Sequence, residues 1–370
     1  MFNFLKPKIQ GFGVDLSDFS VKIIAFEKKA GKISLSSFGR QEIIPGIIEE
    51  GEIKKEAELI EIIKKAVKEV QGSPLKNKYC VVSLPEAESF VRVLQLPLMD
   101  KSEVGEAIKW EIETNIPLGL NEIYYDWQII NSLDKEATAA NQQHLDILVG
   151  VLPKRIVNPY LNVLKMAGLQ PLAFEIESLA IARALLKNGT CEEPTMVIDM
   201  GAKKTSLVIF FRQAVYLTAS LPISNSSFIT TLSEKLYVNA EEAKRIKFEG
   251  GLNFEDPKDQ AFQALKPSLD ELIAKIKSYS DFFQSHAGTS LNKQNVKINN
   301  VLLCGGGAKF MNLNRFLEKE LQIPVAIGKP WLNAFPAEKP RLLPIFDKTE
   351  SLAYTTAIGL ALRGINNEEQ

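Results

Sequence analysis

Apolar and polar residues alternate in two stretches that lie far apart in the chain and that predict similar β-hairpins. The first stretch covers residues 12–26, with its turn just after Asp15, and the second covers 196–210, with its turn just after Asp199. A hairpin that recurs with its aspartate at the same turn position predicts two halves built on one plan. We expect these halves to face each other across a cleft.

The segments around the hairpins alternate between the apolar period of strands and that of helices. Predicted strands cover 33–39, 79–85, 90–97, 123–130 and 144–152. Predicted helices cover 54–71, 154–168, 174–187, 228–236, 268–286 and 353–362, and two more follow the capping residues Asp100 and Asn239. Between 86 and 153 the predicted elements are three strands and one helix, and this group predicts a compact αβ insertion in the first half of the chain.

A third element, at 301–310, is a buried strand that ends in three consecutive glycines, Gly305 to Gly307, before a further helix. Glycines at the carboxyl end of a strand cost backbone entropy, which favours close approach by a ligand. The alternative is a glycine-rich turn that only packs helix on strand. Neither a P-loop nor a dinucleotide-binding fingerprint is present, because the spacing of glycine, lysine and hydroxyl residues matches neither motif.

The chemistry of the hairpins suits phosphate. Small residues let the backbone turn sharply and bring N–H groups towards an anion. The aspartates Asp15 and Asp199 would not touch phosphate directly, but would hold a hydrated Mg²⁺, an ion that keeps several waters and takes few carboxylates. The alternative for either hairpin alone is an aspartate that caps its own turn.

Composition narrows the function classes. The 370 residues are 45% hydrophobic and 24% charged, with a net charge of −1, so no global field attracts nucleic acid or an anionic membrane. The three cysteines stand far apart in apolar runs and fit free thiols in a reducing compartment. Residues 1–8 lack the apolar core of a signal peptide, and no uncharged run is long enough to cross a bilayer. We therefore expect a cytosolic protein that meets a membrane through a partner.

Taken in this order, the two hairpins and the glycine turn resemble the actin and heat-shock chaperone ATPase fold. Within that superfamily the chain closely resembles the PilM family of type IV pilus assembly proteins and, more distantly, the cell-division protein FtsA. The motifs that carry the resemblance are Gly13-Val14-Asp15, Val82-Ser83-Leu84-Pro85, Leu96-Pro97-Leu98-Met99, Ile116-Pro117, Tyr125-Asp126-Trp127 and Ala240-Glu241 with Lys244.

The resemblance implies an α/β, actin-like or ribonuclease-H-like duplicated fold, with two lobes around a nucleotide cleft and an inserted subdomain of the FtsA and PilM type. The implied first lobe is 1–85 and 154–190, with the C-terminal helix 353–365, and the insertion is 86–153. The implied second lobe has its core at 191–226 and 297–352 and a helical subdomain at 227–296.

Carried over residue by residue, the resemblance implies ATP and Mg²⁺ as cofactors. Asp15 and Asp199 would hold the metal, and Glu177 is the candidate catalytic residue. The implied nucleotide-binding residues are Ser17, Asp18 and Lys22 in the first turn, Gly201, Ala202, Lys203 and Thr205 in the second, Glu241 and Lys244 at the ribose, and Gly305, Gly306 and Gly307 at the adenosine. The alternatives are a solvent-directed Lys22 and a surface ion pair between Glu241 and Lys244.

One departure from the family pattern weakens the implied nucleotide site. Ser17 stands where the pattern has glycine, and the acidic Asp18 follows it. A Cβ restricts positive φ, and a second carboxylate opposes the phosphates. We therefore expect weak or no ATPase activity.

The resemblance implies a cytoplasmic scaffold of the pilus inner-membrane platform, recruited to the cytoplasmic face of the inner membrane. Its partners would be the N-terminal cytoplasmic peptide of PilN, bound near 86–153, and other platform proteins, with self-association as a further possibility and no nucleic acid. The alternatives are an FtsA-like, filament-forming, membrane-associated ATPase, a GspL-like cytoplasmic scaffold of type II secretion, and a kinase of the sugar-kinase type.

Overall fold

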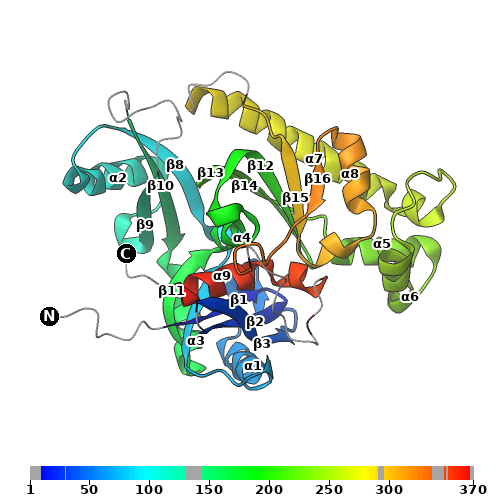
Figure 1. The fold of residues 1–370 in the computed structure, drawn as a ribbon, viewed down its shortest axis with the longest axis horizontal. Coiled ribbons are helices and arrows are strands. Elements are labelled where there is room, and N and C mark those ends of the chain that lie inside the picture. The colour runs from blue at the N-terminus through cyan, green and yellow to red at the C-terminus, as the bar shows by residue number, and fades with distance from the viewer. Residues whose placement is uncertain are drawn as a thin grey trace.

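The computed structural model describes residues 10–29, 31–130, 144–290, 296–335, 346 and 349–366. Two large β-sheets lie on opposite sides of a central pair of helices, α4 (Glu177–Leu185) and α9 (Thr355–Ile365), as Figure 1 shows. A smaller sheet, the predicted insertion, stands to one side of them. Residues 1–8, which were examined for a signal peptide, lie outside the described part of the chain.

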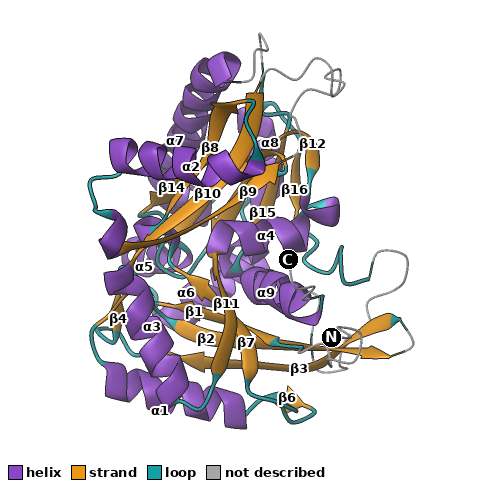
Figure 2. Ribbon diagram, turned by 90° about the vertical axis from the view of Figure 1, so that its left-hand side faces the viewer, coloured by secondary structure: helices purple, strands orange, loops and turns teal. Residues whose placement is uncertain are grey.

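The first large sheet contains the first predicted hairpin. Its strand order is β11-β7-β1-β2-β3-β6, with β1 parallel to β7 and antiparallel to β2. The strands are β1 (Phe12–Ser17), β2 (Ser20–Lys29), β3 (Lys32–Glu42), β6 (Gln71–Gly72), β7 (Tyr79–Leu84) and β11 (Gln170–Ile176), and a separate small pair is β4 (Ile48–Glu49) with β5 (Glu52–Ile53). Helices α1 (Glu56–Lys68) and α3 (Lys154–Met166) bury their apolar faces on this sheet (Figure 2).

The second large sheet repeats the plan. Its order is β14-β13-β12-β15-β16, and β12 is antiparallel to β13 and parallel to β15, as β1 is to β2 and β7. The strands are β12 (Cys191–Met200), β13 (Thr205–Arg212), β14 (Ala214–Leu221), β15 (Asn300–Cys304) and β16 (Val325–Ile327). Its helices are α5 (Asn225–Leu236), α6 (Ala240–Arg245), α7 (Gln260–Ser290) and α8 (Leu313–Leu321). The duplication predicted from the two hairpins is thus present in both sheets.

The insertion at 86–153 is a three-stranded sheet with one helix across it. Strands β8 (Phe90–Pro97) and β9 (Ile123–Ile130) both pair antiparallel with β10 (His144–Pro153). Helix α2 (Lys101–Asn115) begins with the predicted capping box of Asp100 and Glu103. Its buried positions Val104, Ile108 and Ile112 share a core with this sheet.

Helix α9 lies unusually close to its neighbours because small residues face them, as the sequence predicts. A Cβ on Gly359 would lie 1.9 Å from the carbonyl oxygen of Ala180 in α4. A Cβ on Gly13 of β1 would lie 2.3 Å from the carbonyl oxygen of Ala357. These contacts fix α9 and α4 between the two sheets, directly beside the ends of the hairpins.

Two predictions of secondary structure were wrong. The helix predicted at 174–187 begins at Glu177, because the residues before it form strand β11. The helix predicted at 54–71 ends at Lys68, because Gln71 and Gly72 form the short strand β6. Strands β14 and β16 were not predicted. In the described residues, no helix combines the length and the apolar character needed to cross a bilayer.

Candidate functional site

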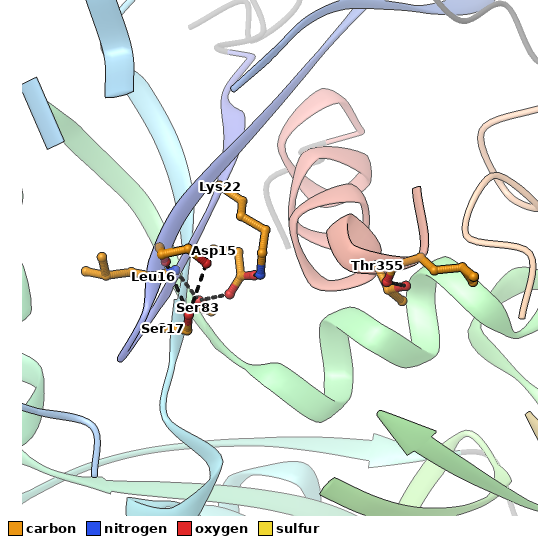
Figure 3. A network of polar contacts seen from close by, with 8 residues as sticks. Asp15, Leu16, Ser17, Lys22, Ser83 and Thr355 are labelled. Carbon is orange, nitrogen blue, oxygen red and sulfur yellow. Dashed lines mark hydrogen bonds and ion pairs between the residues drawn. The ribbon is translucent and has the colours of Figure 1, made fainter. Parts of the chain in front are cut away.

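Asp15, near the end of β1, is held by two side chains in a buried network (Figure 3). Its Oδ2 accepts a hydrogen bond of 2.7 Å from Lys22 Nζ, and its Oδ1 accepts one of 3.2 Å from Ser83 Oγ. The same Ser83 Oγ accepts the backbone N–H of Leu16 at 3.0 Å. The Lys22 side chain is only 15% exposed, so it points to Asp15 and not to solvent.

The first turn closes without glycine. Ser17 Oγ donates to the carbonyl oxygen of Ser20 at 3.2 Å, and no residue of the turn has a positive φ. The predicted conflict between a Cβ and positive φ therefore does not arise at Ser17. Asp18 turns towards the small β4–β5 pair, where its Oδ1 accepts the backbone N–H of Gly51 at 3.0 Å.

The second turn is fastened to the start of helix α5. The carbonyl oxygens of Gly201 and Ala202 accept the backbone N–H groups of Asn225 and Ser226, at 3.1 and 2.9 Å. Within the turn, Gly201 N–H donates to the carbonyl oxygen of Lys204 at 2.9 Å. A helix N-terminus has unpaired N–H groups, so the turn satisfies them and gains a fixed position.

The glycine turn lies directly against the second hairpin. Gly305 has a φ of +80°, and a Cβ there would lie 2.2 Å from Asp199 Oδ1. A Cβ on Gly307 would lie 2.7 Å from the Cβ of Met200, whereas the nearest atom to one on Gly306 is 3.8 Å away. Position 305 therefore requires glycine, both because of this close approach and because of its positive φ.

The tips of the two hairpins meet. Lys203 Nζ, in the second turn, lies 4.3 Å from the centre of the Phe19 ring in the first. Burial raises the pKa of Asp199, and the nearby charge of Asp15 raises it further, whereas Lys22 and Lys204 lower it. The two predicted metal-binding aspartates are therefore within electrostatic reach of each other.

Glu177, the candidate catalytic residue, is the first residue of α4 and faces the same group of charges. Burial raises the pKa of Glu177 to about 7, the charges of Asp15, Glu86 and Asp199 add to this effect, and Lys204 opposes it. A carboxyl group with a pKa near neutrality is suited to proton transfer. We call the residues around these two turns, the glycine turn and Glu177 the inter-sheet site.

Two members of the inter-sheet site were missed by sequence reasoning. Glu86, just before β8, accepts hydrogen bonds from the backbone N–H and Oγ of Ser178, at 3.0 and 3.1 Å, and burial raises its pKa. Lys204 belongs to the second turn, but nucleotide binding was assigned to its neighbours Lys203 and Thr205 instead. In the sequence, Glu86 could have been found as the glutamate that directly follows Ser83-Leu84-Pro85. Lys204 could have been found as the second of two consecutive lysines in the turn.

Glu241 and Lys244 pair with each other on the surface of α6. Their Nζ–Oε1 distance is 2.7 Å, and the side chains are 82% and 49% exposed. This is the surface ion pair that the sequence left open as an alternative. Among the described contacts, none joins either residue to the two turns, although the charge of Glu42 in the first sheet reaches Lys244.

Lys247, one turn beyond Lys244, is buried and was also missed. Its ammonium group donates to Asn225 Oδ1. It lies 5.2 to 5.3 Å from the ring centres of Phe228, Phe248 and Phe310. Burial lowers the pKa of Lys247 to about 7. Because the backbone N–H of Asn225 holds the second turn, the hydrogen bond from Lys247 to Asn225 helps to position that turn.

The acidic groups suit a metal that arrives with a ligand. In the described residues, no group of three His, Cys, Asp or Glu side chains is placed to hold an ion. Two aspartates within electrostatic reach, beside a turn that only glycine fits, match an ion that takes few carboxylates and completes its shell with water and phosphate oxygens. The residues therefore fit Mg²⁺ accompanied by a polyphosphate.

Comparisons with known proteins identify the family and the fold of the chain. A model of the family described as type IV pilus assembly protein PilM matches residues 13–365. A solved PilM-PilN type IV pilus biogenesis complex is similar with a TM-score of 0.75 and 22% identity, covering 97% of this chain and 100% of that chain. MreB 5 of Spiroplasma citri bound to AMPPNP is similar with a TM-score of 0.53 and 11% identity, covering 97% of this chain and 96% of that chain.

Two further proteins are similar to this chain. The ethanolamine utilization protein EutJ of Carboxydothermus hydrogenoformans has a TM-score of 0.54 and 14% identity, over 97% of this chain and 91% of that chain. The cell division protein FtsA of Pseudomonas aeruginosa is 20% identical over 283 residues, which are 66% of this chain and 62% of FtsA. The match to FtsA thus covers less than two thirds of its length.

Proposed function

The chain belongs to the PilM family of type IV pilus assembly proteins and has an actin-like fold related to FtsA, and from this we propose a scaffold that binds ATP, Mg²⁺ and a PilN peptide. In this proposal it works at the cytoplasmic face of the inner membrane, as part of the pilus assembly platform. The proposed domain division is the one implied by the sequence, with the insertion at 86–153.

The nucleotide half of the proposal is supported chiefly by the contact between Gly305 and Asp199. Gly305 must be glycine because a Cβ would clash with Asp199 Oδ1, so the turn lies directly against the second hairpin, at the carboxyl end of a central strand, where α/β sheets bind ligands. The related MreB 5 was solved bound to AMPPNP, a triphosphate analogue. We propose that the adenosine lies along the glycine turn and that the phosphates lie between the two hairpin turns.

Asp15 and Asp199 would hold the Mg²⁺ through its water shell. When bound, the ion would neutralise charge on the phosphates and fix their orientation. The residues of this chain do the rest: Lys22 holds Asp15 in place, and the second turn presents its backbone from the start of α5. Glu177 is the residue we propose for holding or moving a proton, with a pKa near neutrality.

Hydrolysis is expected to be weak. Asp18 is committed to the Gly51 N–H and Lys22 to the Asp15 carboxylate, so few groups of the first turn are free to stabilise a transition state. In this proposal ATP acts as a structural element that fixes the two lobes relative to each other.

The partner half of the proposal concerns the insertion. The similar solved structure contains PilM together with PilN, and we propose that this chain binds the N-terminal cytoplasmic peptide of a PilN protein near 86–153. An extended peptide beside an exposed strand is a common mode of recognition.

Two titrations test the proposal. Isothermal calorimetry with ATP in the presence and absence of Mg²⁺ is expected to show Mg²⁺-dependent binding, and the absence of any binding would remove the nucleotide half. A synthetic PilN N-terminal peptide, titrated against the full chain with a scrambled peptide as control, tests the partner half in the same way.

The relation to FtsA favours one second candidate, a filament that forms on membranes with ATP. Sedimentation of the full chain with ATP and with vesicles of anionic lipid discriminates between the two. Pelleting that depends on both ATP and lipid would favour the filament, and a chain that stays in the supernatant favours the scaffold.

A further inference from the structure

The turn between β12 and β13 carries a lysine whose charged group is not engaged. The backbone carbonyl of Lys204 closes the turn by accepting Gly201 N–H at 2.9 Å. Its side chain is half-buried, and its ammonium group donates to no other side chain in the described part of the protein. Lys22, in the first hairpin, instead contacts Asp15 directly at 2.7 Å.

Carboxylates surround Lys204 at longer range. The charge of Glu177 raises the pKa of Lys204 most, and Asp18, Glu86 and Asp199 add to it against the opposing effect of burial. Asp18 and Asp199 belong to the hairpins of the two large sheets, Glu86 lies at the start of the insertion, and Glu177 is in α4. The ammonium group thus stays charged, and no side chain within the described ranges accepts a hydrogen bond from its three N–H donors, so these donors can bind an anion.

The sheet order sets where such an anion would lie. Strand β12 lies between β13 and β15, so Asp199, at the end of β12, separates Lys204 from Gly305, which follows β15. Adjacent strands are about 4.8 Å apart, which puts Lys204 roughly 10 Å from the glycine turn. A nucleotide whose adenosine lies on the glycine turn therefore extends its phosphates past Asp199 towards Lys204.

We propose that Lys204 binds the terminal phosphate of the nucleotide and thereby distinguishes a nucleoside triphosphate from a diphosphate. This inference rests on the proposed nucleotide function and adds the residue that determines specificity within it. An ammonium group binds phosphate as a point charge, and here it also offsets the acidic residues that would otherwise repel the terminal phosphate. The competing interpretation is that Lys204 is only a counter-ion for those acidic residues.

The test compares ATP and ADP on the full-length chain by calorimetry, at constant Mg²⁺. Lys204→Met is expected to weaken ATP binding by about tenfold or more and to leave ADP binding within about threefold, the range of one charged hydrogen bond. Lys204→Arg keeps the charge and is expected to keep the preference for ATP. Lys266→Met, at an exposed lysine of α7 paired with Asp270, is the matched control and is expected to change neither.

The outcomes separate the alternatives. Equal weakening of ATP and ADP by Lys204→Met, or no weakening of either, would overturn the proposal and identify Lys204 as a counter-ion. Thermal unfolding without ligand shows whether each variant is folded, and Lys204→Arg reports on phosphate binding if the Met variant is not.

Tripolyphosphate, used as a probe without adenosine, separates this inference from the proposed function. Binding of tripolyphosphate that depends on Lys204, in a chain that does not bind ATP, would uphold the phosphate-binding lysine and overturn the nucleotide function. A chain that binds neither overturns both.

Discussion

The ammonium group of Lys203 lies over the ring of Phe19, 4.3 Å from its centre, and this contact joins the turns of the two duplicated hairpins. The two residues belong to different sheets and are separated by most of the first half of the chain. A cation over an aromatic face is attracted by the quadrupole of the ring. The contact bridges the two turns at the inter-sheet site.

This contact predicts a measurable coupling between the sheets. In a double-mutant cycle of Lys203→Met and Phe19→Leu, urea unfolding is expected to give a coupling free energy of about 0.5–1 kcal/mol. A control cycle of Lys203→Met with Phe26→Leu is expected to give none, because Phe26 packs against Trp331 and Phe335. Additive effects in the first cycle would contradict a direct contact.

Gly305→Ala is expected to destabilise the chain by about 2–4 kcal/mol, because an alanine there combines a positive φ with a clash against Asp199 Oδ1. Loss of ATP binding should accompany the change. Gly168→Ala is the control: its φ is +86°, but nothing lies within 4 Å of the added Cβ, so only the backbone cost of about 1 kcal/mol applies. Equal costs for the two variants would show that the contact with Asp199 is not tight.

Gly359→Ala is expected to cost about 3 kcal/mol or more, because its Cβ would lie 1.9 Å from the carbonyl oxygen of Ala180 and would force α9 away from α4. Gly105→Ala is the matched control within a helix. No atom lies within 4 Å of its Cβ, so α2 is expected to gain up to about 1 kcal/mol. Thermal or urea unfolding measures both, and a neutral Gly359→Ala would be inconsistent with the helix contact.

Lys247 predicts a rise of stability with pH. Its folded pKa is lowered from 10.5 to about 7, so between these values the unfolded chain holds the proton and the folded chain does not. The free energy of unfolding contributed by this residue therefore increases from pH 7 towards 10.5. Lys247→Met is expected to stabilise the chain at pH 7 by about 2–4 kcal/mol and to flatten this part of the pH profile.

Urea unfolding at several pH values checks the effect of Lys247, with Lys235→Met, an exposed lysine of α5, as control. A profile for Lys247→Met that keeps the full slope of the natural chain would show that Lys247 is charged and satisfied. The aromatic rings around it would then offset the cost of burial.

Glu177 predicts the opposite slope at lower pH. Its pKa is raised from 4.5 to about 7, so the folded chain holds a proton that the unfolded chain has lost, and stability falls as pH rises from 4.5 to 7. Glu177→Gln is expected to stabilise the chain by about 1–3 kcal/mol at pH 7.5 and to remove this slope. The measurement is urea unfolding from pH 4.5 to 7.5, and an unchanged slope would place the pKa of Glu177 near its ordinary value.

The hairpins and the glycine turn were predictable because their signals are local. Alternating residues around Asp15 and Asp199 specify strands that end in turns, and the positive φ of Gly305 requires the residue type that the sequence shows. The side-chain contacts within the site were not predictable, because they join elements far apart in the chain.

Strand β11 shows why the remaining elements were missed. Glu175 lies inside it, and a glutamate before an apolar run is typical of a helix start. In the structure this carboxylate is buried, with ion pairs to Arg183 at 2.7 Å and Arg363 at 3.4 Å. One of these arginines comes from the far end of the chain, so only the folded protein shows why a charged residue is tolerated in a strand. Lys204 and Glu86 were missed for the same reason.

The position of Glu86 has a mechanical consequence. The polypeptide leaves the first sheet at Leu84, and two residues later the carboxylate of Glu86 is clamped by the first turn of α4, the helix that begins with Glu177. The pivot of the insertion is thereby anchored to that helix. A change in the orientation of the insertion would therefore be coupled, through these two hydrogen bonds, to the position of α4 between the two large sheets.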